Sequence, residues 1–282
     1  MITHPTLTGI LLHSDQELAS LLGAGILCRN TIHEWPLSCV QKVTLDNGKQ
    51  LIYKSQLPPT VEPAFYEQAE SALLPGHQLM GRFGDCDTMI IDWIDAPLLR
   101  DQGLNSHQLI EHGKRITAQI GDIVGDLPVY LDIGSERAWL EVAGSTMEKL
   151  SALITDGRFH FSNSDVLGNL QHWIRSDQVL ETISCNPRVI HGDLKADQVF
   201  LLDDEYRIID WQRPYIAPPE VDLVSLLVDL HIEPCHIVKQ SVIDIFWFLR
   251  LHWAIEAQFT LFPERRWPIF NGWAEEAISH IL

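Results

Sequence analysis

Three side chains with oxygen atoms, close together in the sequence, are of the kind that binds metal ions. Asp193 lies in the segment His191-Gly-Asp, Gln198 follows five residues later, and Asp210 ends an apolar run. Magnesium prefers such oxygen ligands and usually takes the rest of its coordination from phosphate and water. A carboxylate that is not a metal ligand can accept a proton from a hydroxyl. The set therefore predicts phosphoryl transfer.

The residues between these side chains predict how they come together. Val199 to Leu202 and Arg207 to Ile209 are short apolar runs on either side of a polar turn, a pattern typical of a β-hairpin. Because the two arms are of similar length, we expect Gln198 and Asp210 side by side, with the Asp193 loop beside them. A surface hairpin with acidic turns would show a similar pattern.

The catalytic and metal-binding loops of the aminoglycoside phosphotransferase and choline kinase group resemble two segments of this chain, His191-Gly-Asp193-Leu-Lys195-Ala-Asp-Gln198 and Ile209-Asp210-Trp211. The group consists of small-molecule kinases that share the protein-kinase-like fold. The resemblance implies that His191, Asp193 and Lys195 belong to the catalytic loop. Asp193 would be the catalytic base and Lys195 would contact phosphate. The resemblance also implies that Asp210 is the main magnesium ligand.

The resemblance implies that Gln198 occupies the second metal position, where the family prefers Asn. Both side chains offer an amide oxygen, but Gln is one methylene longer. Magnesium tolerates displaced ligands poorly. We therefore expect either a shifted loop or a weak second metal site.

Composition excludes several other classes of protein. The formal net charge of -18 disfavours binding to a nucleic-acid backbone. Five cysteines without a Cys-x-x-Cys pair fit a reducing cytoplasm better than a disulfide scaffold. No apolar stretch approaches the ~18 residues that a membrane span needs. The histidine spacing does not suggest zinc.

A lysine in the first part of the chain is suited to contact phosphate. The runs Trp35 to Leu45 and Gln50 to Ser55 flank an Asn47-Gly48 turn, a strong hairpin signal, and Lys54 lies in the second strand. By resemblance, Lys54 reaches the α- and β-phosphates of the nucleotide. A lysine exposed on a strand is the alternative.

A helix predicted from Glu62 to Leu74 follows that strand. The register of the family places Glu67 as the partner of Lys54. Glu70, one turn further on, remains an alternative. A further helix, begun by the capping box Ser14-Asp-Gln-Glu17, is expected near the N-terminus.

An apolar strand from Thr88 into the Pro97 turn resembles the hinge between the lobes of a kinase. By resemblance, adenine would hydrogen-bond there to the carbonyl of Asp92 and the amide of Ile94. No Gly-x-Gly-x-x-Gly loop precedes Lys54, and this group of kinases commonly lacks one.

The second part of the chain is predicted to be mainly helical, with helices at 106–127, 139–153 and 166–183 and a loop at 157–164. Asp222, at the start of another helix, matches the aspartate that braces the catalytic loop in the family. It would also complement the helix dipole. The aromatic residues at 242–262 are expected mostly in the core. Asp244, Glu256, Trp247 and Trp253 are unranked candidates for contact with a cationic acceptor.

The resemblance, which covers nearly the whole chain in order, implies an α+β, two-lobed protein-kinase-like fold, with a β-rich N-lobe at 1–95 and a mainly helical C-lobe at 96–282. These observations predict an ATP- and magnesium-dependent phosphotransferase acting on a hydroxyl of a small aminoglycoside-, choline- or sugar-like molecule. The net acidity mildly favours an amine-bearing acceptor. A non-catalytic nucleotide-binding module is the alternative. A metal-dependent hydrolase would need more ligands than this chain supplies.

Overall fold

The computed structural model describes residues 1–162, 165–264 and 266–282, which form two compact units. The first unit contains Met1–Gly103, Asp122–Tyr130 and Ala196–Pro214, and the second contains Leu104–Gly121, Leu131–Lys195 and Tyr215–Leu282. Each unit is therefore built from three separate segments of the chain, and a single boundary near residue 95 does not divide them. The two later segments belong to the first unit because Val124 bridges to Glu70 and Phe200 bridges to Leu98.

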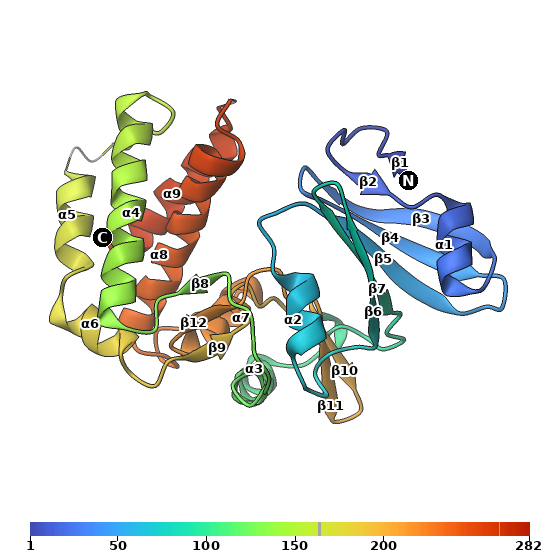
Figure 1. Cartoon of the computed structure of the whole chain (residues 1–282). Helices are drawn as coiled ribbons and strands as arrows, with labels where there is room; N and C mark the ends of the chain where they lie inside the picture. Colours follow the sequence, from blue (N-terminus) through green and yellow to red (C-terminus); the bar gives the residue numbers. More distant parts are fainter. Residues whose placement is uncertain (163–164, 265) are drawn as a thin grey trace. The chain divides into compact units, whose positions relative to one another are not determined.

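Five antiparallel strands in the order β3-β4-β5-β7-β6 form the main sheet of the first unit (Figure 1). They are β3 (Ile26–Trp35), β4 (Ser38–Leu45), β5 (Gln50–Gln56), β6 (His77–Phe83) and β7 (Cys86–Asp92). The predicted hairpin is confirmed, and Gly48 in its turn has φ 85°. Its first strand begins at Ser38, because Trp35 already belongs to β3.

One face of this sheet is covered by α1 (Asp15–Leu22) and by the small hairpin of β1 (Ile2–Thr3) and β2 (Leu11–Leu12). The capping box of α1 is confirmed: Ser14 Oγ accepts from the Glu17 amide at 3.3 Å, and Glu17 Oε2 accepts from the Ser14 amide at 2.8 Å. Leu18 and Tyr53 are fully buried in this core. Successive side chains of a strand point to opposite faces of the sheet, so Lys54, next to Tyr53, lies on the face away from this core.

The short helix α2 (Glu62–Gln68) packs on β6 and β7. The helix predicted to reach Leu74 ends earlier, because Ala69 is extended and Glu70 pairs with Val124. Gly125, next to this bridge, has φ 132°, and a Cβ there would lie 2.0 Å from the carbonyl oxygen of Gln68. Only glycine lets this segment approach the end of α2 so closely.

The hairpin predicted between Gln198 and Asp210 is confirmed as β10 (Val199–Leu202) and β11 (Glu205–Ile208). Val199 pairs with Ile208. The Ile209 amide donates to the Gln198 carbonyl at 3.0 Å, which extends the pairing to the mouth of the hairpin. The hairpin is joined to the rest of the first unit by the Ile208 amide, which donates to the Leu73 carbonyl at 2.7 Å.

Helices make up most of the second unit: α3 (Ser106–Ile120), α4 (Glu136–Thr155), α5 (Val166–Trp173), α6 (Asp177–Ile183), α7 (Glu220–Asp229), α8 (Gln240–Glu256) and α9 (Pro268–Ile281). Asn105, not Ser106, caps α3, which ends before the predicted 127. The single helix predicted at 166–183 is two helices, separated at 174–176. Of the predicted loop at 157–164, residues 163 and 164 lie outside the described residues.

The core of the second unit is built around α8, which contacts α4, α6, α7 and α9 (Figure 1). Phe246, Trp247 and Phe248 are buried, as expected for aromatic residues at helical spacing. The Trp139 ring lies 4.9 Å from that of Phe248, and its indole nitrogen donates to the Ile174 carbonyl at 2.9 Å. Across the described ranges, every helix is too short or too polar to cross a membrane.

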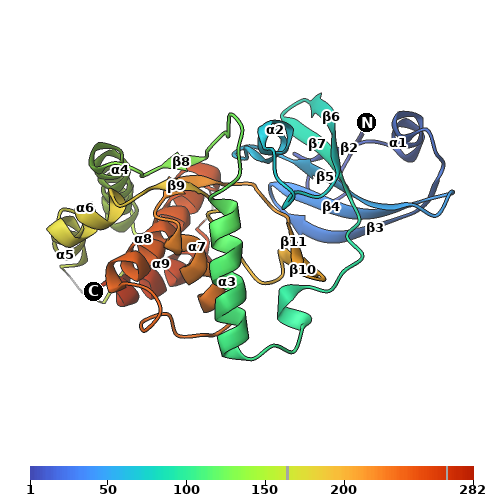
Figure 2. The same ribbon diagram turned by 90° about the horizontal axis from the view of Figure 1, so that it is seen from below.

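A small sheet in the order β8-β12-β9 holds the segments that lead into the His191 loop and towards α7. It consists of β8 (Leu131–Asp132), β9 (Arg188–Ile190) and β12 (Tyr215–Ala217). The chain continues from β9 into the His191 loop and from β12 towards α7. Figure 2 shows α3 beside α7, where a Cβ at Gly113 would lie 2.8 Å from Leu223.

Candidate active site

Lys54 of β5 is held between two carboxylates of the first unit. Its Nζ lies 2.5 Å from Glu62 Oε2 and 2.8 Å from Asp210 Oδ1. Lys54 is 4% exposed and Glu62 is 0% exposed, so two of the three charges are removed from water. Burial alone would lower the pKa of Lys54, but Asp210 and Glu62 together raise it above its usual value. The lysine is therefore a charged donor.

Glu62, and neither Glu67 nor Glu70, is the partner of Lys54. The prediction of Glu67 was wrong because α2 turns its Glu62, Phe65 and Tyr66 face inward, which leaves Glu67 exposed. Glu70 lies beyond the end of the helix and is also exposed. Burial raises the pKa of Glu62, and the Lys54 ammonium opposes that rise.

The sequence held a signal for Glu62 that our prediction did not use. Glu62, Phe65 and Tyr66 have the spacing of one helical face, and all three are buried. A glutamate at the first position of a helix also complements the helix dipole. That common role gives no sign that Glu62 pairs with a lysine. Only the fold distinguishes the two roles.

Gln198 and Asp210 lie side by side at the mouth of the β10–β11 hairpin, as predicted. Gln198 Nε2 lies 3.3 Å from Asp210 Oδ2. Asp210 has φ 73°, an uncommon backbone conformation for a residue with a side chain. The next residue, Trp211, is fully buried and stacks on Phe65 of α2, with ring centroids 4.5 Å apart and an interplanar angle of 9°. This stack ties the Asp210 segment to α2.

The loop predicted to be catalytic, in the second unit, is held by Asp222 of α7. Asp222 Oδ2 accepts from the His191 amide at 2.6 Å, and Oδ1 accepts from the Gly192 amide at 2.9 Å. Burial raises the pKa of Asp222 to about 7, the two amides oppose the rise, and Asp193 adds to it. Lys195 Nζ lies 3.0 Å from Asp193 Oδ2. The structure thus places His191, Asp193 and Lys195 in one loop, and Asp222 holds that loop through its backbone amides.

The predicted hinge residues Asp92 and Ile94 follow the end of β7. The Asp92 carboxylate pairs with Lys49 at 2.9 Å, and both side chains are about half exposed. Lys42 Nζ lies 3.6 Å from the ring centre of Trp93. Lys49, Asp92 and Trp93 border a hollow of about 630 Å³ at the β4–β5 turn, whose lining does not include Ile94. Contact of adenine with the Asp92 carbonyl and the Ile94 amide stays a prediction.

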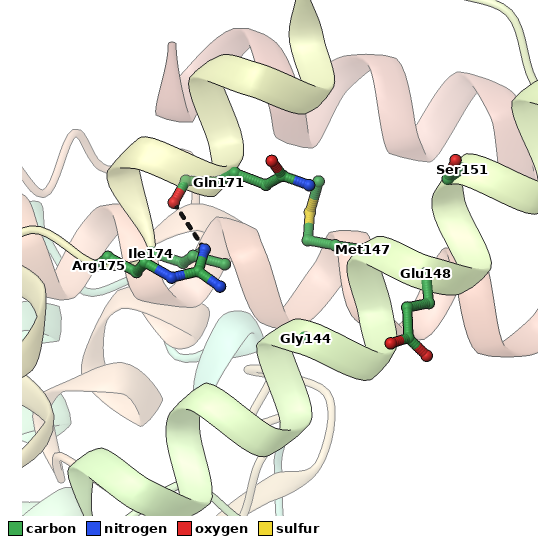
Figure 3. Close-up of a pocket in the computed structure, with 7 residues that line it drawn as sticks. All are labelled: Gly144, Met147, Glu148, Ser151, Gln171, Ile174 and Arg175. Atoms are coloured by element: carbon green, nitrogen blue, oxygen red, sulfur yellow. Dashed lines mark hydrogen bonds between the residues drawn. The ribbon is translucent and has the colours of Figure 1, made fainter.

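Another hollow, of about 440 Å³, lies between α4 and the end of α5 (Figure 3). Arg175 Nη1 donates to the Gln171 carbonyl at 3.0 Å on one side of it. The lining residues are Gly144, Met147, Glu148, Ser151, Gln171, Ile174 and Arg175. None of the predicted site residues is among them.

Solved structures of phosphotransferases are similar to the whole chain. Spectinomycin phosphotransferase APH(9)-Ia, in complex with ADP and spectinomycin, is 15% identical with a TM-score of 0.59, and the match covers 96% of this chain and 98% of that one. A thermostable mutant of aminoglycoside phosphotransferase APH(4)-Ia in its apo form is 11% identical with a TM-score of 0.63, covering 95% and 98%. A choline kinase from Cryptosporidium parvum Iowa II is 13% identical with a TM-score of 0.59, covering 91% and 88%.

These likenesses show a protein-kinase-like fold, with a β-sheet lobe and a helical part, and confirm the predicted fold class. The model of the phosphotransferase enzyme family (APH) matches residues 85–236. The chain belongs to that family, which confirms the resemblance found in the sequence. No curated protein matches the chain in sequence.

Proposed function

We propose that this protein transfers the γ-phosphoryl group of ATP to a hydroxyl of a small, amine-bearing molecule, with Mg²⁺ as cofactor. The observation that carries the proposal is the position of Lys54, a buried and charged donor 2.8 Å from the Asp210 carboxylate. A fixed cation beside an oxygen ligand suits a nucleotide phosphate and the metal bound to it.

The donor set fits magnesium. Asp210 supplies a carboxylate whose side chain is 36% exposed. The ranges that the structure describes contain no group of three or more His, Cys, Asp or Glu side chains that could hold a metal. Few protein ligands are usual for a magnesium ion that also binds phosphate and water. When bound, the ion neutralises charge on the phosphate oxygens.

The other residues of the site would contact the acceptor hydroxyl and the phosphates or keep the loop in shape. Asp193 would accept the proton of the acceptor hydroxyl, and Lys195, 3.0 Å from that carboxylate, would contact phosphate. His191 and Asp222 would keep the loop in shape, because Asp222 accepts from two consecutive amides of the loop. Lys54 would bind the α- and β-phosphates while Glu62 holds its ammonium in place.

Two observations favour an amine-bearing acceptor. The formal net charge of -18 attracts cationic molecules. The similar structures are named for spectinomycin, hygromycin B, choline and macrolides as their small-molecule ligands or substrates. We propose that the acceptor of this protein is of this kind.

Measuring ADP release across aminoglycosides, amino alcohols, macrolides and sugars tests the proposal. Asp193→Asn should lower turnover by ~10²–10⁴-fold, because the loop loses its base, and should leave nucleotide binding intact. Asp197→Asn is the matched control in the same loop. The Asp197 carboxylate is half-exposed and lies 3.2 Å from Arg100, so its loss should leave turnover unchanged.

Two results would count against the proposal. Full turnover in Asp193→Asn would show that Asp193 is not the catalytic base. Stabilisation of the wild-type protein by ATP and Mg²⁺ without turnover on any acceptor would favour the non-catalytic nucleotide-binding module.

A further inference from the structure

The side chain of Gln198 faces the Asp210 carboxylate with its nitrogen. We infer that Gln198 positions Asp210 rather than binding a metal itself, so that the nucleotide complex of this protein holds one divalent ion. The inference rests on the proposed function, because it concerns the metal that would accompany the nucleotide.

The chemistry of the contact decides which end of the amide faces Asp210. A carboxylate oxygen only accepts hydrogen bonds, and an amide has one donating and one accepting end. At 3.3 Å from Asp210 Oδ2, the atom of Gln198 must therefore be the NH₂ nitrogen. Magnesium takes oxygen ligands. The end of Gln198 that could bind it is directed away from this carboxylate.

The backbone makes this arrangement hard to change. The Gln198 carbonyl accepts from the Ile209 amide at 3.0 Å, so the two residues flanking the hairpin mouth are held together. Gln198 is only 7% exposed, and a buried amide needs its hydrogen bonds. Turning the amide over would bring its oxygen against Asp210 Oδ2 and lose the bond.

Asp210 is held at both of its oxygens. Lys54 donates to Oδ1 at 2.8 Å and Gln198 donates to Oδ2 at 3.3 Å. A carboxylate has about four lone-pair sites, more than these two bonds use. Residues that orient a metal ligand by hydrogen bonds commonly set its metal affinity. The longer side chain of Gln198 thus orients Asp210 by a hydrogen bond, where the shorter Asn of the family would bind the metal.

Counting ions in the complex tests the inference without measuring catalysis. Wild-type protein is mixed with a non-hydrolysable ATP analogue and titrated with Mn²⁺, and free Mn²⁺ is measured by electron paramagnetic resonance. We expect one ion for each protein–nucleotide complex. Two ions in the wild-type complex would overturn the inference, and this readout needs no variant.

Two variants separate the positioning role from a ligand role. Gln198→Asn shortens the side chain, so its amide can no longer reach Oδ2 and its oxygen can serve as a metal ligand, as in the family pattern. The count should rise to two. Gln198→Ala should keep one ion but bind it ~10–100-fold more weakly, the usual effect of losing an orienting contact. Unchanged Mn²⁺ affinity in Gln198→Ala, or a count of one in Gln198→Asn, would contradict the inference.

The two proposals fail in different ways. A wild-type protein that binds neither the ATP analogue nor Mn²⁺ contradicts the proposed function, and the inference with it. A protein that binds the analogue with two ions contradicts the inference alone.

Discussion

Lys54 and Asp210 lie 156 positions apart in the chain and 2.8 Å apart in space. Their ion pair joins strand β5 to the mouth of the β10–β11 hairpin within the first unit. Glu62 completes the cluster from the first turn of α2, so β5, the helix that follows it and the remote hairpin mouth meet at one ammonium group. Substitutions at these positions should therefore affect both nucleotide contacts and folding, in ways that can be separated.

Glu62→Gln should impair phosphotransfer, whereas Glu67→Gln should not. The glutamine keeps the shape of Glu62 but loses the charge that holds the Lys54 ammonium at 2.5 Å. A misplaced catalytic group commonly costs about 10²-fold, so we expect kcat/KM to fall on that order. Glu67 lies on the exposed side of the same helix and is the matched control. Steady-state kinetics with varied ATP would show the difference, and equal losses in the two variants would contradict the assignment of Glu62.

Lys54→Met should destabilise the first unit by about 3–5 kcal/mol, because it leaves the buried Glu62 carboxylate without its cation. Lys49→Met is the control. Lys49 pairs with Asp92 at a similar distance of 2.9 Å, but both side chains are exposed, and such pairs contribute about 1 kcal/mol or less. Urea unfolding measures both changes. Equal losses for the two lysines would show that burial does not govern the Lys54 pair.

Acid should weaken the second unit through His252 of α8. Burial lowers the pKa of His252 to about 4, while Glu256 opposes the shift and Lys149 adds to it. Its Nδ1 lies 2.8 Å from Thr146 Oγ1, whose own proton goes to the Val142 carbonyl, so the neutral ring is the donor.

The sign of this pH effect follows from the two protonation states. In the unfolded chain His252 has a pKa near 6.5, so below that pH the unfolded state takes up the proton before the folded state does. Stability is therefore lost as pH falls from about 6.5 towards 4, by about 2 kcal/mol at pH 5. His252→Gln should flatten the curve of unfolding free energy against pH in this window. The exposed His107→Gln is the control, and parallel curves for wild type and His252→Gln would contradict the expectation.

Local chemistry explains which parts of this fold the sequence predicted. The Ser14 capping box, the Asn47-Gly48 turn and the β10–β11 hairpin depend on a few neighbouring residues, and all were confirmed. The end of α2 was predicted wrongly at Leu74, because Glu70 lies outside the helix and pairs with Val124 from a remote segment. Pairing that depends on distant parts of the chain is not visible in a local pattern.

The candidate site shows the same division. The neighbours Gln198 and Asp210 were predicted because the hairpin between them is local. The partner of Lys54 was misassigned because family register was used in place of the buried face of α2. The direction of the Gln198 amide depends on a contact that only the folded hairpin creates.

The interleaved make-up of the first unit affects how its chemistry can be inherited. A gene fragment for Met1–Gly103 would encode Lys54 and Glu62 but not Asp210, which the chain supplies only after most of the second unit has been translated. Lys54 and Asp210 therefore cannot be transferred between proteins as one contiguous cassette. Recombination that exchanged the sheet alone would separate them.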